Sequence, residues 1–144
     1  MRVLKWTVIA IVIVGLSWVV IFGAYNSGVK RRVGELKKIE AQLVSADEKV
    51  EHLVNEYNQR IDSYQEDSDA LSAIKVNILQ TIQNIDTAHA IRKRINPYNP
   101  DSSTYLDNLS IYRYLATQAE KLNESTEQKL KEYDENLKNA ESPK

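Results

Sequence analysis

The distribution of apolar residues divides the chain into a short apolar segment and a longer amphipathic remainder. Residues 6–25 read WTVIAIVIVGLSWVVIFGAY and contain no charged side chain. A helix of this length would extend ~30 Å, the thickness of the hydrocarbon core of a bilayer. Trp6 and Tyr25 lie at its ends, where aromatic rings favour the headgroup level. The pattern predicts that residues 1–27 are a membrane anchor with one transmembrane helix.

A cleaved signal peptide is the alternative interpretation of this segment, and it requires small residues at positions −3 and −1 of the cleavage site. Gly15 and Ser17 would serve, but cleavage there would leave the apolar residues 18–22 at the new N-terminus. Cleavage after Ala24 would place the large Phe22 at −3. We therefore expect an uncleaved anchor, followed near residues 23–28 by a short turn.

Beyond the anchor, apolar residues recur with the period of amphipathic helices. There is no Gly or Pro between Glu35 and Asn96, which favours helix throughout. The first apolar stripe comprises Val29, Leu36, Leu43, Val50, Tyr57 and Tyr64, with Ala46, Leu53 and Ile61 between them. The second comprises Leu71, Ile74, Ile78, Ile82, Ile85 and Ala88. The third comprises Leu109, Tyr112, Ala116, Ala119, Leu122, Leu130, Tyr133 and Leu137.

Two polar segments separate these stripes. Residues 65–69 interrupt the first stripe, and we expect a turn or kink there, with Asp67 or Ser68 capping the next helix, rather than one continuous helix. The second helix is expected to end near Arg94. Residues 96–100 contain two prolines and mark a definite break. After them, residues 104–107 resemble a capping box with Asp in place of Glu, so Thr104 is a candidate N-cap.

These elements predict an all-α protein. One N-terminal transmembrane helix is followed by an antiparallel bundle of about three long helices over residues 28–140, and residues 141–144 form a frayed tail. Narrow apolar stripes are not stable alone in water, so the helices are expected to bury them against one another or against a partner.

Composition and charge disfavour several kinds of chemistry. The net charge of −1 does not indicate nucleic-acid binding, and there is no cysteine for a disulfide or a thiol nucleophile. His52 and Glu56 share a helix face, but zinc needs a third ligand and none follows at a matching spacing. His89 is expected to be structural, near a helix C-terminus. All four glycines precede residue 35, which excludes a glycine-rich phosphate loop. We therefore expect a protein that is not an enzyme and uses no cofactor or metal.

Tyrosine is the residue type that points to binding, with eight in the chain. Four of them lie on the apolar stripes and are expected in the core. Tyr98 and Tyr105 flank the proline-containing break, and Tyr114 lies off the third stripe. Since exposed aromatic side chains are enriched at interfaces, we predict that Tyr98, Tyr105 and Tyr114 contact a partner.

Several short segments resemble the LemA family, bacterial proteins with one transmembrane helix and an antiparallel helical bundle. Residues 25–29 followed by Arg32 resemble its Tyr-Asn-x-x-Val segment and Arg, and residues 39–43 resemble Ile-Asp-x-Gln-Leu. The spacing to Leu53-Val54 agrees with the family's Leu-Val pair. Residues 98–101 resemble a Tyr-Pro-Asp turn, and residues 122–130 a Leu-x-x-Thr-Glu-x-x-Ile segment with one extra residue.

This chain also departs from the LemA pattern. The family's Trp before the Ile-Asp segment, its Arg pair and its Pro before Leu-Val are missing, and the spacing from Tyr25 to Ile39 is about one helical turn shorter. The resemblance implies a non-enzymatic, membrane-associated bundle.

Two functions fit these features. The first is a membrane-anchored interaction or scaffold protein, LemA-like, held in the bilayer by residues 6–25 and binding a protein partner or another copy of itself. The alternative is a phage inner-membrane spanin, a lysis protein with an N-terminal anchor and a periplasmic coiled coil. Either would be a single-pass protein of a bacterial inner membrane, encoded by the bacterium or by a phage.

Flanking charges distinguish the two orientations. Arg2 and Lys5 precede the anchor, whereas five basic residues follow within 20 positions of Tyr25: Lys30, Arg31, Arg32, Lys37 and Lys38. By the positive-inside rule, this excess favours a cytoplasmic helical region, the orientation implied by the LemA resemblance and opposite to that of a spanin.

Overall fold

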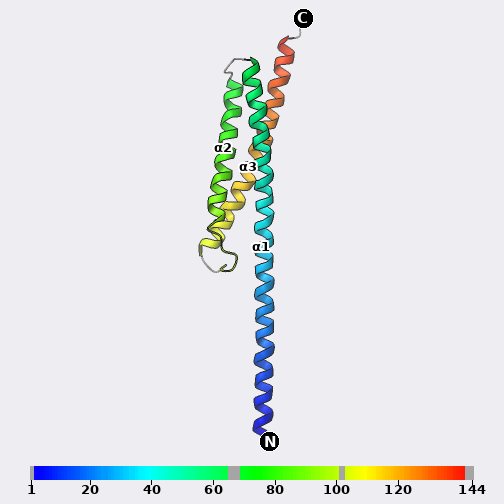
Figure 1. Ribbon diagram of the computed structural model, residues 1–144, viewed down its shortest axis with the longest axis vertical. Coiled ribbons are helices and arrows are strands. Elements are labelled where there is room, and N and C mark those ends of the chain that lie inside the picture. Colours follow the sequence, from blue (N-terminus) through cyan, green and yellow to red (C-terminus); the bar gives the residue numbers. More distant parts are fainter. Residues whose placement is uncertain (1, 65–68, 101–102, 142–144) are drawn as a thin grey trace. The chain divides into compact units, whose positions relative to one another are not determined.

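The computed structural model describes residues 2–64, 69–100 and 103–141, which form three helices (Figure 1). Side chains are described for residues 14–62, 69–100 and 103–140. Helix α1 spans Arg2–Tyr64, α2 spans Asp69–Arg92 and α3 spans Ser103–Glu141. All regular structure in these ranges is helical, which confirms the all-α prediction.

The chain divides into two units, Met1–Lys37 and Lys38–Lys144. In the first, α1 runs through residues 23–28 without a break, so the predicted turn there is wrong. The physical reason is that an isolated glycine costs a helix only ~1 kcal/mol, and no proline is present to remove a backbone hydrogen bond. The predicted anchor falls partly on residues 6–13, whose side chains lie outside those described.

Within the described residues, no helix is long and apolar enough to cross a membrane. The predicted transmembrane span is therefore not confirmed and stays a prediction.

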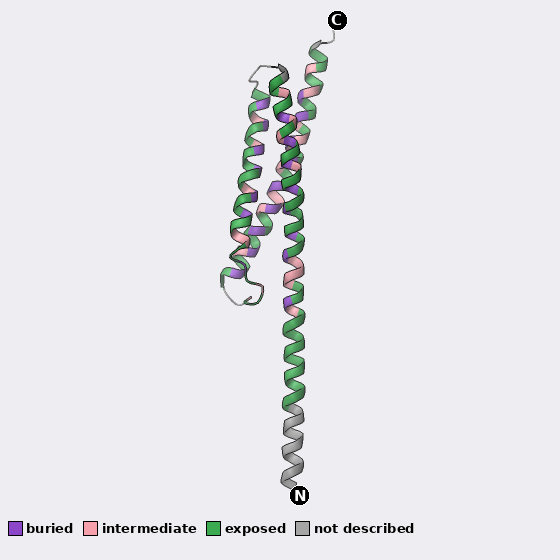
Figure 2. Ribbon diagram, viewed as in Figure 1, coloured by how far each residue is buried: buried purple, intermediate pink, exposed green. Residues whose placement is uncertain are grey.

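The second unit contains the helical bundle: residues 38–64 of α1, followed by α2 and α3. The chain runs up, down and up, so α2 is antiparallel to both neighbours and α1 lies parallel to α3 (Figure 1). Figure 2 shows the buried positions following the inward side of each helix. Leu43, Val50 and Leu53 of the first predicted stripe are at most 3% exposed. This burial of the predicted stripes confirms the bundle.

The buried positions repeat in steps of four and three residues, a heptad pattern typical of coiled-coil packing. In α3 the positions are Tyr105, Leu109, Tyr112, Ala116, Ala119, Asn123, Thr126, Leu130 and Tyr133. In α2 they are Leu71, Ile74, Ile78, Thr81, Ile85 and Ala88. Three of these positions hold polar residues, Thr81, Asn123 and Thr126. They face inward because the spacing of the repeat places them there, even where the adjacent residue is more hydrophobic.

This regularity corrects three predicted core positions. Ile82 is 39% exposed, and its neighbour Thr81 is buried, with its hydroxyl donating to the Asn77 carbonyl at 2.9 Å. Leu122 is only half-buried, and Asn123 takes the inward position. Ile61 is also 39% exposed. The next step of the repeat after Tyr57 falls on residue 60 instead.

The two predicted breaks are both present. Helix α1 ends at Tyr64 and α2 begins at Asp69; the proposed caps Asp67 and Ser68 lie outside the described residues. Helix α2 ends at Arg92, two residues before the predicted end. Since α3 begins at Ser103, Thr104 is its second residue and is not the N-cap.

The described part of the connection between α2 and α3, residues 93–100, contains two tight turns. The Ile95 amide donates to the Arg92 carbonyl at 3.2 Å, and the Ile95 side chain is buried. The Asn96 side-chain oxygen accepts from the Tyr98 amide at 3.0 Å, an Asx turn that starts the second reversal. Asn96 and the prolines thus reverse the chain so that α3 can pack along α2.

Candidate functional site

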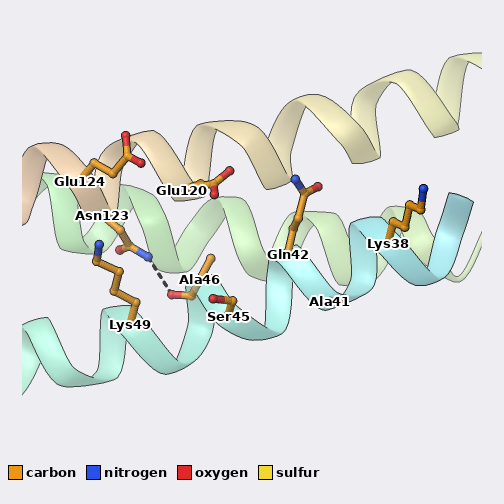
Figure 3. A pocket seen from close by; sticks show the side chains of 9 residues that line it. All are labelled: Lys38, Ala41, Gln42, Ser45, Ala46, Lys49, Glu120, Asn123 and Glu124. Carbon is orange, nitrogen blue, oxygen red and sulfur yellow. Dashed lines mark hydrogen bonds between the residues drawn. The ribbon is translucent and has the colours of Figure 1, made fainter.

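One hollow of the bundle lies between the parallel helices α1 and α3 (Figure 3). Its volume is about 390 Å³, and nine residues line it: Lys38, Ala41, Gln42, Ser45, Ala46, Lys49, Glu120, Asn123 and Glu124. The small side chains of Ala41, Ser45 and Ala46 leave this space open on the α1 side. We call it the α1–α3 groove.

Asn123 is a buried polar residue at the base of the groove. It is 1% exposed, and its side-chain nitrogen donates to the Ala46 carbonyl oxygen at 2.8 Å (Figure 3). A carbonyl can only accept a hydrogen bond, so the amide nitrogen must face Ala46. Asn123 Oδ1 is then buried with no hydrogen-bond partner among the described residues. One bond fixes the register of α3 on α1, while an acceptor remains unsatisfied.

The two walls of the groove carry opposite charges. Lys38 and Lys49 project from α1, and Glu120 and Glu124 belong to α3 (Figure 3). With the amide of Gln42, these groups offer both donors and acceptors at the rim. The groove is therefore suited to polar groups of mixed charge, such as those of a peptide segment.

Towards the C-terminal end of α3, a second hollow of about 540 Å³ continues along the same two helices and shares Lys49 with the first. Glu127 lies between two lysines, with its carboxylate oxygens 2.8 Å from Lys49 Nζ and 2.9 Å from Lys131 Nζ. Hydrogen bonds from Lys49 and then Lys131 lower the pKa of Glu127 to about 2. The carboxylate therefore stays ionised over the whole physiological range.

Arg60 of α1, which lines this second hollow, forms an ion pair with Asp134 of α3 through two hydrogen bonds. Its Nε donates to Asp134 Oδ1 at 2.9 Å and its Nη2 donates to Asp134 Oδ2 at 2.7 Å. Nη1 donates to the Glu56 carbonyl at 2.8 Å. The hydrogen bond with Arg60 lowers the pKa of Asp134 and raises the pKa of Arg60 itself. The Arg60 side chain is only 18% exposed, so this pair is better shielded from solvent than a surface pair.

The histidines have separate surroundings. His52 is 72% exposed, and its Nδ1 lies 3.8 Å from Glu56 Oε1, an ion pair only when the imidazole is protonated. His89 is exposed on α2. In the part of the chain that the structure describes, no group of three or more His, Cys, Asp or Glu side chains could hold a metal ion.

The three tyrosines predicted to contact a partner do not form one surface. Tyr98 and Tyr114 are 62% and 61% exposed, whereas Tyr105 is 4% exposed. Tyr105 and Tyr114 are nine residues apart on α3, which places them on opposite sides of a helix. Tyr105 packs inward with the α3 core, and only Tyr98 and Tyr114 present their rings outward.

Sequence reasoning missed Asn123 and the Arg60–Asp134 pair. A usable signal existed for Asn123, because it continues the four-and-three spacing from Ala116 and Ala119 to Thr126 and Leu130. Nothing in the sequence pairs Arg60 with Asp134, which lie 74 positions apart.

No family model, curated protein or solved structure matches this chain. The resemblance to LemA therefore rests on its short sequence segments alone.

Proposed function

We propose that this chain is a non-catalytic, membrane-anchored interaction protein with a LemA-like organisation. Residues 6–25 hold it in a lipid bilayer, and the bundle binds a protein partner or a second copy of the chain along the α1–α3 groove. Tyr98 and Tyr114 are further candidate contacts of this partner.

The observation that carries the anchor is the exposed apolar surface of α1. Eight large side chains between Val14 and Tyr25 are 51–70% exposed: Val14, Leu16, Trp18, Val19, Val20, Ile21, Phe22 and Tyr25. They point to all sides of the helix, and a helix that is apolar all round belongs in lipid or in the interior of a protein. Together with the uncharged residues 6–13, this surface supports insertion into a bilayer.

The observation that supports an interaction role is the polar character of the α1–α3 groove. Its walls carry Lys38 and Lys49 opposite Glu120 and Glu124, and the buried Asn123 fixes the helices on either side. Such a rigid surface of mixed charge can select a partner by complementary charge.

Membrane extraction of the full chain tests the anchor. Leu16→Arg places a charge near the centre of the predicted span, where it costs ~2.5–3.5 kcal/mol of insertion free energy. We expect the wild-type chain to resist alkaline carbonate and the variant to be released. Val76→Arg is the matched control, because Val76 is 60% exposed on α2 and outside the anchor. Release of the wild-type chain by carbonate would refute the anchor.

Orientation separates the LemA-like function from the spanin alternative. The chain has no cysteine, so Ser110→Cys on the exposed side of α3 provides a unique thiol. We expect this thiol to be protected in intact spheroplasts and labelled by an impermeant reagent only after lysis. Labelling before lysis would place the bundle outside the cytoplasm and favour the spanin.

Photocrosslinking in living cells tests the groove. A benzoylphenylalanine at Ser45, which lines the groove, is expected to yield a discrete crosslinked species. The same residue at Ser72, exposed on α2, serves as the control. Equal crosslinking from both positions, or none from Ser45, would contradict a binding role for the groove.

A further inference from the structure

Three consecutive cations, Lys30, Arg31 and Arg32, follow the exposed apolar part of α1, and we call them the basic collar. Lys30 and Arg31 are exposed, and Arg32 is half-buried. They lie five to seven residues after Tyr25, which corresponds to ~8–11 Å along a helix. Glu35 is the only acidic residue between positions 26 and 39, so this stretch has a strong positive excess.

The depth of the collar matches a phospholipid headgroup layer. A bilayer is ~40–45 Å thick with a hydrocarbon core of ~30 Å, which leaves ~5–8 Å of headgroups on each side. Helical side chains tilt towards the N-terminus, here towards the apolar segment. Arg32 shows this directly, because a Cβ added to Gly28 would lie 3.2 Å from Arg32 Nη1. Its guanidinium thus lies one turn back along the helix, only ~5 Å beyond Tyr25.

The angular spread of the collar favours many headgroups over one compact anion. Successive residues rotate by 100° around a helix, so the three cations fan over ~200° of its circumference. Side chains spread in this way cannot converge on a single soluble phosphate. They can each contact a different lipid, and arginine can bind a phosphate with two parallel hydrogen bonds.

We propose that the basic collar binds the phosphate groups of anionic phospholipids, such as phosphatidylglycerol, in the leaflet at the C-terminal end of the anchor. This inference rests on the proposed membrane anchor and adds the class of lipid that surrounds it. A cation near an anionic membrane surface strengthens binding by about fivefold.

Energy transfer from tryptophan to labelled lipid measures this preference. The chain has only two tryptophans, Trp6 and Trp18, and both lie in the proposed anchor. The full chain is reconstituted in phosphatidylcholine vesicles with traces of acyl-chain-labelled phosphatidylglycerol or phosphatidylcholine. We expect a relative binding constant for phosphatidylglycerol at least about fivefold higher, which high salt should reduce.

Two variants of equal charge loss locate the effect. Lys30→Gln/Arg31→Gln should reduce the preference by up to about 25-fold, or to near unity, since two of the three cations are lost and each is worth about fivefold. Lys37→Gln/Lys75→Gln should change it by less than about twofold, because Lys37 lies ~18 Å beyond Tyr25 and Lys75 belongs to α2. Glutamine favours helix, and circular dichroism verifies that both variants keep their helicity.

The outcomes separate failure of the inference from failure of the anchor. Equal transfer to both lipids would overturn the lipid preference and leave the anchor standing, as would equal losses in the two variants. Absence of transfer to either lipid would refute the anchor and the inference with it. Inorganic phosphate at constant ionic strength should not reduce the preference; if it does, the collar binds a soluble anion and the lipid assignment is wrong.

Discussion

Replacing the buried Asn123 by leucine should stabilise the bundle. Asn123 makes one hydrogen bond, from its nitrogen to the Ala46 carbonyl, and buries Oδ1 without a partner among the described residues. Loss of that bond costs ~0.5–1.5 kcal/mol, whereas removal of an unsatisfied buried acceptor recovers ~1–3 kcal/mol. A leucine has the same branching and number of heavy atoms and adds apolar burial worth ~1.5–3 kcal/mol. Before any strain from its greater bulk is subtracted, the balance favours Asn123→Leu by at least ~1 kcal/mol.

The opposite result is expected for aspartate at the same position. Asn123→Asp keeps the shape of the side chain but replaces the donor with an oxygen that faces the Ala46 carbonyl. A buried carboxylate without a donor costs ~3 kcal/mol or more, unless it takes up a proton. Thr126→Val is the matched control, because the Thr126 hydroxyl donates only within its own helix, to the Leu122 carbonyl at 2.7 Å. We expect a change below ~1 kcal/mol for this variant.

Thermal unfolding of the full chain in neutral detergent, followed by circular dichroism at 222 nm, measures all three variants. For a domain of about this size, 1 kcal/mol corresponds to ~4–8 °C in Tm. We expect a higher Tm for Asn123→Leu, a much lower Tm for Asn123→Asp and little change for Thr126→Val. A lower Tm for Asn123→Leu would refute the reasoning, because it would mean that Oδ1 is satisfied or that the Ala46 bond is worth more than its general value.

Three further predictions concern the packing of α1 against α3 and use the same unfolding assay. Leu53→Ala should lower the free energy of unfolding by ~2–5 kcal/mol. Lys49→Ala should lower it by less than ~1 kcal/mol, because the Lys49 side chain is 41% exposed and solvent screens its ion pair. Similar losses in the two variants would mean that the inward face of α1 is wrongly assigned. Arg60→Lys should lower stability by ~1 kcal/mol, since an ammonium cannot reproduce the two parallel bonds to Asp134; an unchanged Tm would show that the second bond contributes nothing. Because the pKa of Glu127 is lowered from 4.5 to about 2, its contribution to the stability of the fold is complete above about pH 5 and is lost as the pH falls towards 2. Glu127→Gln should therefore make unfolding less dependent on pH between these values. An unaltered pH dependence would contradict the ion pairs of Glu127 with Lys49 and Lys131.

The sequence was sufficient for the parts of the fold that depend on periodicity. Two polar breaks and three apolar stripes predict three helices and most of their inward faces, because a helix buries residues at fixed angular intervals. The errors occurred where an apolar residue adjoins a polar one. Hydrophobicity predicts Ile82 and Leu122 as the inward residues, whereas the spacing of the repeat places Thr81 and Asn123 there. At these two positions the spacing is the better guide to the core.

The candidate site was less accessible from the sequence. The α1–α3 groove depends on which residues of two distant helices lie opposite each other, and local periodicity does not determine that register. Arg60 and Asp134 each look like ordinary surface charges until the helices are paired. The tyrosines were chosen by residue type, and packing then turned Tyr105 inward.

The unbroken repeat of α3 also limits how the length of this protein can change during evolution. Loss of one residue, such as Glu120, would rotate everything after it by ~100° and bring Glu124, Glu127 and Lys131 into the positions now held by Asn123, Thr126 and Leu130. Loss of seven residues would keep the helix in phase. The connection at residues 93–100 is not helical, so a change in its length does not rotate the buried positions of a helix. Orthologous chains should therefore vary freely in length at this connection, but along α3 only in multiples of seven.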